Sequence, residues 1–454
     1  MHDPFSRQPQ PLDEAEVARR RVPKRRVFGG AIGLALLLGS GLLAVALILR
    51  PGALPAHASG GAPTPTPTVS SPVPGQPQPL GSLYLAAAGS LSRLNMRTGD
   101  VLWNMPDSSP MNPLVVGQML FFNDYGEAGP ALTAVNVRTG QQVWSSQSYP
   151  NGFLLGAGNM LYDSLCDFSS GSAACYLYGI NASTGVQRWS YDLQQGTTWI
   201  TFHNGVLYGV SYTKYFALNA ATGSLLWQQD LLRYTDQEAT MAPVVSGNVL
   251  SFASCNTTKQ SSGYAGCYLY AFNAHTGQEL WHMATASSLQ SSPAIMNGVI
   301  YAGAVDGTFY ALKEQDGTQL WSTNVGGLVG QVLAQNGSIY VGVLSADGST
   351  FSIVALNAAT HATRWGQAST LGQSSAQPLS LVQSGAGRSL HPQAPRTPFS
   401  GGPAAHPFVL EHGLIYLQNG SASVSVLNAA NGYLAARFTA PDDAALYGFA
   451  VTAL

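Results

Sequence analysis

A nine-residue pattern, Asn-x-x-Thr-Gly-x-x-x-Trp, recurs along this chain and limits its possible folds more than any other feature. An Asn at the end of a strand can hydrogen-bond the backbone two residues on, and the following Gly supplies the positive φ that closes a short hairpin loop. The Trp then lies in a new, half-buried strand. A single copy is compatible with an isolated hairpin, whereas eight copies indicate a repeat. Five copies are complete, at 95–103, 136–144, 181–189, 219–227 and 273–281, and three are looser, at 313–321, 357–365 and 428–436.

The spacing of the copies predicts the architecture. Successive motif tryptophans lie 38 to 54 residues apart, and two further strand-like runs precede each motif. A period of about 40–45 residues with strand signals is typical of a four-stranded propeller blade. We therefore predict an all-β, eight-bladed β-propeller with four-stranded antiparallel blades, whose strands are labelled A to D from the axis outwards.

The ends of the repeat region predict how the ring closes. The first repeat begins at Ser82 with a strand B and has no strand A of its own, while the chain ends in an extended run, 447–454, that no repeat follows. We expect this last run to pair with strand B of blade 1, because closure removes the open sheet edges.

The distribution of charge over residues 1–49 predicts a membrane anchor. Residues 27–49 contain no charged residue, and this run is long enough to form a helix that spans about 30 Å of hydrocarbon. Basic residues cluster in 1–26, so we expect a cytoplasmic tail and an extracytoplasmic propeller. A signal peptide cleaved after Ala58 is the alternative, although its apolar core would be unusually long. A Pro/Thr-rich linker, 50–79, then leads to the propeller domain, 80–454, with a loop insertion at 366–406.

The chain contains four cysteines, all inside the repeats. They permit three disulfide pairings, and only the pairings within hairpins place the partners on adjacent strands. Disulfides would fit an oxidising, extracellular location, and metal ligation is the alternative. The cysteines flank the B–C loops of blades 3 and 5 and are Cys166, Cys175, Cys255 and Cys267.

These loops predict a recognition face. In a propeller the B–C loops and the crossings between blades share one face, which we call the cystine face, and the A–B and C–D turns share the other, which we call the plain face. The insertion 366–406 follows a strand D, so it also leaves from the cystine face, either as part of a binding surface or as a spacer. Variable loops on a rigid scaffold commonly carry binding, so we expect a protein, peptide or cell-envelope partner there.

The motif resembles the pyrroloquinoline-quinone-like (PQQ-like) β-propeller repeat, whose tryptophans dock between neighbouring blades. The run from Ala217 to Trp227 matches this tryptophan-docking pattern, and the resemblance covers 80–454. It departs at His361, which replaces the motif Gly, and at Ala436, which replaces Trp. The resemblance implies a structural role for seven side chains, Trp103, Trp144, Trp189, Trp227, Trp281, Trp321 and Trp365.

Two functional branches share this repeat. One branch, the quinoprotein dehydrogenases, holds PQQ and Ca²⁺ over the central channel with adjacent cysteines and an acidic base, but no two cysteines are adjacent here. His203 and Trp199 fall in a strand A near the axis, where core packing is the favoured explanation for both; stacking of a ligand at the channel mouth is the alternative for Trp199. The other branch is a non-catalytic scaffold of outer-membrane assembly. The sequence therefore favours a membrane-anchored, extracytoplasmic scaffold that binds a protein or ligand, with no catalytic residues, no metal and no nucleic-acid partner, and a PQQ-dependent oxidoreductase as the alternative.

Overall fold

The computed structural model of the chain describes the propeller region in most of its length. The described residues are 68–69, 75–126, 129–148, 153–167, 174–193, 199–211, 214–230, 237–239, 241–256, 259–260, 263–264, 267–289, 291–345, 351–366, 408–419, 422–440 and 444–452. The predicted tail 1–26, the membrane span 27–49 and the insertion beyond residue 366 lie outside them. Within the described part, no helix is both long and apolar enough to cross a membrane.

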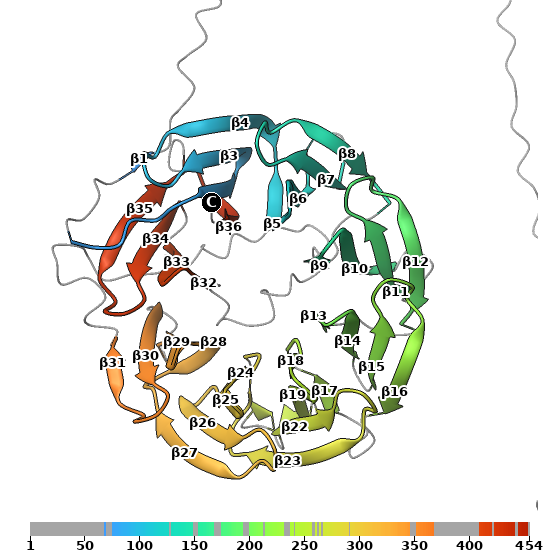
Figure 1. The fold of residues 1–454 in the computed structure, drawn as a ribbon, viewed down its shortest axis with the longest axis vertical. Helices are drawn as coiled ribbons and strands as arrows, with labels where there is room; N and C mark the ends of the chain where they lie inside the picture. The colour runs from blue at the N-terminus through green and yellow to red at the C-terminus, as the bar shows by residue number, and fades with distance from the viewer. Residues whose placement is uncertain are drawn as a thin grey trace, which may run out of the picture. The chain divides into compact units, whose positions relative to one another are not determined.

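The repeats fold into eight antiparallel sheets arranged as a ring (Figure 1), which confirms the predicted eight-bladed propeller. Each blade has its strands in the order A, B, C, D, with A nearest the axis, and the sheets of blades 5 and 8 contain a fifth strand. The strands of blades 1 to 4 are β36 (Leu446–Thr452), β2 (Ser82–Ala87), β3 (Gly89–Asn95) and β4 (Val101–Ser108); β5 (Pro110–Val116), β6 (Met119–Asp124), β7 (Ala131–Asn136) and β8 (Gln142–Ser146); β9 (Phe153–Ala157), β10 (Met160–Asp167), β11 (Ala174–Asn181) and β12 (Gln187–Asp192); β13 (Trp199–His203), β14 (Val206–Ser211), β15 (Lys214–Asn219) and β16 (Leu225–Asp230).

Blades 5 to 8 follow the same plan, with a strand A in two pieces in blade 5. Their strands are β17 (Gln237–Ala239) with β18 (Val244–Ser246), β19 (Val249–Asn256), β22 (Cys267–Asn273) and β23 (Glu279–Thr285); β24 (Ala294–Met296), β25 (Val299–Gly303), β26 (Thr308–Lys313) and β27 (Gln319–Asn324); β28 (Leu328–Gln335), β29 (Ser338–Leu344), β30 (Phe351–Asn357) and β31 (Thr363–Trp365); β32 (Phe408–Glu411), β33 (Leu414–Asn419), β34 (Ser423–Asn428) and β35 (Leu434–Thr439).

The C-terminal strand closes the ring as predicted. β36 pairs antiparallel with β2, with Val451 opposite Leu83 and Ala450 opposite Tyr84. Leu446 belongs to the same buried cluster as Phe438 of blade 8. The last strand of the chain therefore completes the first blade and joins it to the last one.

A second closing contact was not predicted. β1 (Thr68–Val69) pairs with the outer side of β35, with Thr68 opposite Thr439 and Val69 opposite Phe438. The sequence boundary at residue 80 assigned Thr68 and Val69 to the linker. In the structure they add a fifth strand to blade 8, which is the blade whose motif ends in Ala436 in place of Trp.

The repeated turn forms through the hydrogen bonds expected of its residues. In blade 4, Oδ1 of Asn219 accepts the backbone N–H groups of Ala221 and Thr222, at 3.0 and 3.1 Å. Gly223 has a φ of 71°. Its lack of a side chain also makes room for a neighbour, because a Cβ there would lie 2.6 Å from Cδ2 of Trp189 in blade 3. The Gly is thus required both by the turn and by the contact between blades.

Six docking tryptophans also donate their indole N–H to the next blade. Nε1 of Trp189 donates to the carbonyl oxygen of Ala220 at 3.1 Å. Burial of a large ring together with a satisfied N–H is a favourable arrangement for Trp. In blade 7, where His361 replaces the Gly, its ring lies 4.5 Å from the Trp321 ring, centroid to centroid. In the next blade, the acceptor is the backbone carbonyl oxygen of the residue that follows the first position of the motif. The same hydrogen bond is made by Trp103, Trp144, Trp227, Trp281 and Trp365.

Candidate functional site

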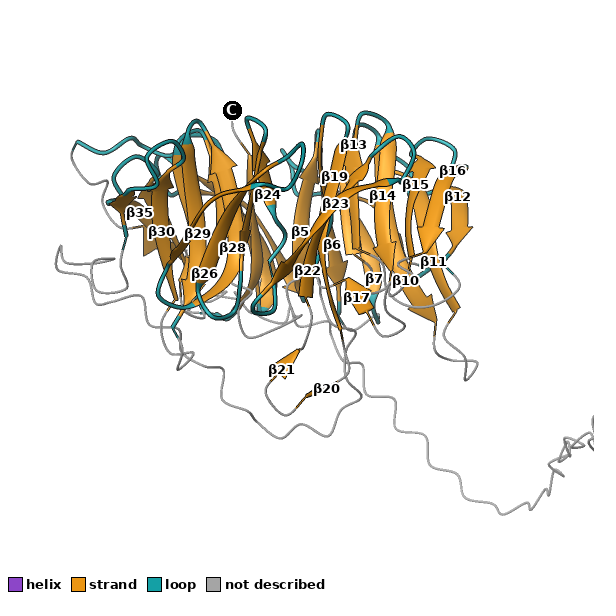
Figure 2. Ribbon diagram, turned by 90° about the horizontal axis from the view of Figure 1, so that it is seen from below, coloured by secondary structure: helices purple, strands orange, loops and turns teal. Residues whose placement is uncertain are grey.

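The cystine face carries the longest described loop structure of the propeller. A disulfide joins Cys255 and Cys267, which lie opposite each other at the last pair of β19 and β22. Between them, β20 (Lys259–Gln260) and β21 (Gly263–Tyr264) form a small hairpin. Figure 2 shows this hairpin below the ring, on the side opposite the repeated turns. Because both cysteine side chains are buried, the bridge anchors the base of the loop in the blade.

Blade 3 repeats this arrangement in its backbone. Cys166 lies opposite Cys175 at the corresponding end of β10 and β11. Cys175 is buried and disulfide-bonded, and its carbonyl oxygen accepts the N–H of Leu193 at 2.9 Å. The two blades that carry cysteines therefore place them opposite each other at the same end of strands B and C.

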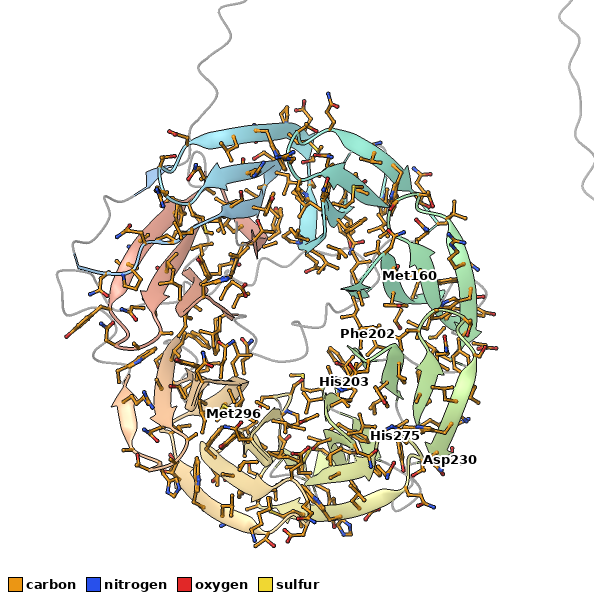
Figure 3. All side chains as sticks on the ribbon, in the orientation of Figure 1. Met160, Phe202, His203, Asp230, His275 and Met296 are labelled. Atoms are coloured by element: carbon orange, nitrogen blue, oxygen red, sulfur yellow. A yellow bond between two sulfur atoms is a disulfide. The ribbon has the colours of Figure 1, made fainter. Side chains whose placement is uncertain are left out.

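The wall of the central channel is poor in acid–base groups. Among the described residues, the innermost strands contain two carboxylates, Glu238 in blade 5 and Glu411 in blade 8. Figure 3 places Phe202 and His203 at the inner end of blade 4 and Met296 at the inner end of blade 6. His203 is half-buried, and its Nε2 lies 3.0 Å from Nδ2 of Asn204. It is thus on the channel side and not in the core.

Trp199 also lies on this innermost strand. It starts β13 opposite Val210 and is half-buried.

These donors do not fit a PQQ–Ca²⁺ centre. Ca²⁺ is bound by several oxygen ligands, carboxylates among them. The described residues contain no group of three His, Cys, Asp or Glu side chains placed to hold a metal. The sequence has no adjacent cysteines either. Among the described residues, the innermost strands therefore offer isolated carboxylates and no cluster of Ca²⁺ ligands.

A cleft of about 340 Å³ opens between blades 6 and 7. It lies where β31 ends after three residues, so the outer part of blade 7 is short. Its lining includes Asn324, Ser352, Val354 and His361. His361 is the one ionisable side chain of this lining, so the cleft contains no acid–base pair.

Among the described residues, the carboxyl group whose pKa is displaced furthest from its ordinary value lies within a blade. Asp163 of β10 is fully buried, and within the described residues neither of its carboxyl oxygens has a hydrogen-bond partner. Burial raises the pKa of its carboxyl to about 8. The corresponding position of strand B is apolar in the other blades, as the cross-strand registers show, and is held by Leu85, Phe122, Gly209, Phe252, Ala302, Val341 and Leu417.

The surroundings of Asp163 follow from the repeat. At the corresponding interface between blades 1 and 2, Phe122 belongs to the same buried cluster as Ala86. By this correspondence we expect Asp163 to lie at the interface with blade 2, where Asn123 is also buried. Asp163 lies away from the channel wall in the second strand of its blade, so the sequence pattern gave no reason to separate it from the other blade carboxylates.

Comparison with known proteins agrees with the repeat pattern. A family model described as outer membrane protein assembly factor BamB matches residues 70–198, 176–265 and 265–436. The BamB of Moranella endobia is 25% identical over 348 residues, which cover 70% of this chain and 79% of that protein. The BamB of Yersinia pestis is 32% identical over 113 residues, or 24% of this chain, and this match spans only 27% of the relative's length.

A quinone-dependent enzyme shares part of the same repeat. The dehydrogenase subunit of the alcohol dehydrogenase (quinone) of Gluconobacter oxydans is 30% identical over 140 residues, which cover 30% of this chain and 12% of that protein. This likeness covers only a few blades, whereas the family model extends over most of the ring. The chain therefore belongs to the PQQ-like repeat family described as outer membrane protein assembly factor BamB.

Proposed function

We propose that this protein is a membrane-anchored, extracytoplasmic scaffold that binds another protein of the cell envelope through its cystine face. The observation that carries the proposal is the loop between Cys255 and Cys267, which projects from a closed ring and is fixed at its base by a disulfide. A rigid ring with constrained loops loses little conformational freedom on binding. The relatives named for assembly of the outer membrane support a protein as the partner.

The membrane anchor is part of this proposal. The uncharged run 27–49 and the basic residues before it support a single span with the N-terminus in the cytoplasm. The disulfide supports an oxidising compartment for the propeller. A phosphatase reporter fused after residue 60 should be active, whereas one fused after residue 20 should be inactive. The reverse pattern would refute the orientation.

Site-directed photo-crosslinking tests the binding face. A photoreactive amino acid at Lys259, in the β20–β21 hairpin, should give a discrete adduct with an envelope protein in intact cells. The matched control is Ala221, an exposed residue of the repeated turn on the plain face, and it should give no adduct. Equal labelling from both positions, or none from Lys259, would refute the cystine face as the binding surface.

The quinoprotein alternative has a separate test. The purified chain is titrated with PQQ and Ca²⁺ and assayed for dye-linked alcohol oxidation. Because the described channel wall lacks a carboxylate cluster, we expect no saturable binding and no turnover. Turnover would overturn the scaffold proposal and assign the function to the channel.

A further inference from the structure

The outermost strands form a rim of sheet edges, and one edge is covered by another segment of the chain. β1 pairs with the outer side of β35, and the side chain of Asn428 donates to Oε1 of Gln76 at 2.9 Å, further along the same segment. Ala435 in this strand is 0% exposed. Its counterpart in blade 4, the residue before the docking Trp, is Leu226, and it is 52% exposed. The rim of this propeller therefore accepts an added antiparallel strand.

The other seven outer strands pair only with strand C in the described structure. Free edges of this kind attract further strands, and proteins protect them with Lys or Arg, with Pro or by shortening the strand. Three of the seven edges have such protection. β4 contains Pro106, β12 contains Arg188, and β31 has only three residues.

The four remaining edges, β8, β16, β23 and β27, contain no Lys, Arg or Pro. Of these, β16 has the most exposed apolar surface, because Leu225 and Leu226 are adjacent and are 48% and 52% exposed. Every residue of β16 except Trp227 is exposed. A register shift precedes the Trp position in all eight blades. In blade 8, β1 pairs with the residues that follow this shift.

The contact in blade 8 also indicates how a strand would bind to blade 4. Ala436 corresponds to Trp227, so Phe438 and Thr439, which pair with β1, correspond to Gln229 and Asp230. A strand that pairs with Gln229 and Asp230 in the same direction would continue past Leu226 and Leu225. Apolar side chains in that continuation would remove both leucines from water. Each Å² of leucine surface removed from water would contribute about 25 cal/mol to the free energy of binding.

We propose that the outer edge of blade 4, from Leu225 to Asp230, binds an extended, aliphatic-rich segment of a partner protein as an added antiparallel strand. Main-chain hydrogen bonds would provide the affinity, and the two leucines would provide the preference for apolar side chains, as in other cases of strand addition. The inference rests on the proposed function, because the partner is a protein, but it assigns a surface on the rim and not on the cystine face.

A labelled peptide tests this site. The probe is a blocked, fluorescent hexapeptide of alternating Thr and Val, titrated into the full-length chain in detergent micelles and followed by fluorescence anisotropy. Leu226→Lys introduces a protective charge into the edge and should weaken binding at least tenfold. The matched control is Leu320→Lys on β27, which changes the same position of blade 6 and should leave the affinity unchanged. A peptide with alternate amide nitrogens methylated should bind at least tenfold more weakly to the unchanged chain.

The results separate this proposal from its rivals. No saturable binding to the unchanged chain, or equal binding to both variants, would overturn it. Light scattering would show a dimer that Leu226→Lys disrupts if a second copy of the chain covered the edge, and that result would also overturn it. Thermal unfolding of both variants is the control that checks whether the exposed substitutions leave the ring folded. Crosslinking from Lys259 reports on the cystine face alone, so failure of the rim site and failure of the proposed function are distinguishable.

Discussion

Replacement of Asp163 by Leu should stabilise the propeller and remove a pH dependence. The carboxyl is fully buried without a hydrogen-bond partner among the described residues, and leucine or another apolar residue is typical of its position in the other blades. Its pKa is about 8 in the folded protein, against 3.8 for an ordinary Asp. The native protein therefore keeps a proton that the unfolded chain releases, and the free energy of unfolding falls as the pH rises from about 4 to 8.

The magnitude follows from the displacement of the pKa. Each pH unit of displacement corresponds to about 1.4 kcal/mol, so four units correspond to about 6 kcal/mol at pH 8 and above. At pH 5 only about 2 kcal/mol of this loss has built up, because the pH is then only about one unit above the pKa of the carboxyl in the unfolded chain. The difference in stability between Asp163→Leu and the unchanged protein should thus grow by several kcal/mol from pH 5 to pH 8.

Urea unfolding followed by tryptophan fluorescence at pH 5, 6.5 and 8 measures this difference. Asp306→Asn, on an exposed turn, serves as the control and should show a constant difference from the unchanged protein. A stability difference for Asp163→Leu that does not change with pH would refute the reasoning. It would show that the carboxyl is hydrated or is paired with a cation in the folded state.

Three further perturbations test the contacts that close and hold the ring. Deletion of 446–452 removes the inner strand of blade 1 and exposes the edge of β2, so the melting temperature should fall by at least about 10 °C, and an unchanged melt would contradict closure by this strand. Gly223→Ala should destabilise the protein by about 2–4 kcal/mol in urea unfolding, because the new Cβ has a positive φ and meets Trp189; a neutral effect would mean that the two blades can separate without cost. Ala436→Trp restores the motif in blade 8, where Ala436 is buried in the strand that pairs with β1. Overpacking should lower the free energy of unfolding by about 1–3 kcal/mol, and a stabilised protein would show that this blade has room for the indole ring.

Much of the architecture could be predicted because it depends on local chemistry. The turn from Asn219 to Gly223 needs only its own residues to form, so each copy could be recognised without its neighbours. The count of the copies then predicted the eight blades, and the missing first strand predicted the role of 447–454. The hairpin position of Cys255 and Cys267 predicted their disulfide for the same reason, since it depends on a single pair of adjacent strands.

The features that depend on distant segments could not be read from the pattern. The pairing of Thr68 and Val69 with β35 joins residues more than 350 positions apart, and Asp163 is unusual because it is fully buried without a hydrogen-bond partner among the described residues. The sequence by itself determined the repeat and its turns, because these follow from hydrogen bonds and side-chain periodicity within about 40 residues, and it indicated the closure of the ring through the strand A that the first repeat lacks. Only the tertiary structure decided which carboxyl is buried without a partner and which sheet edges are covered, because desolvation and edge pairing depend on what the rest of the chain places against each residue.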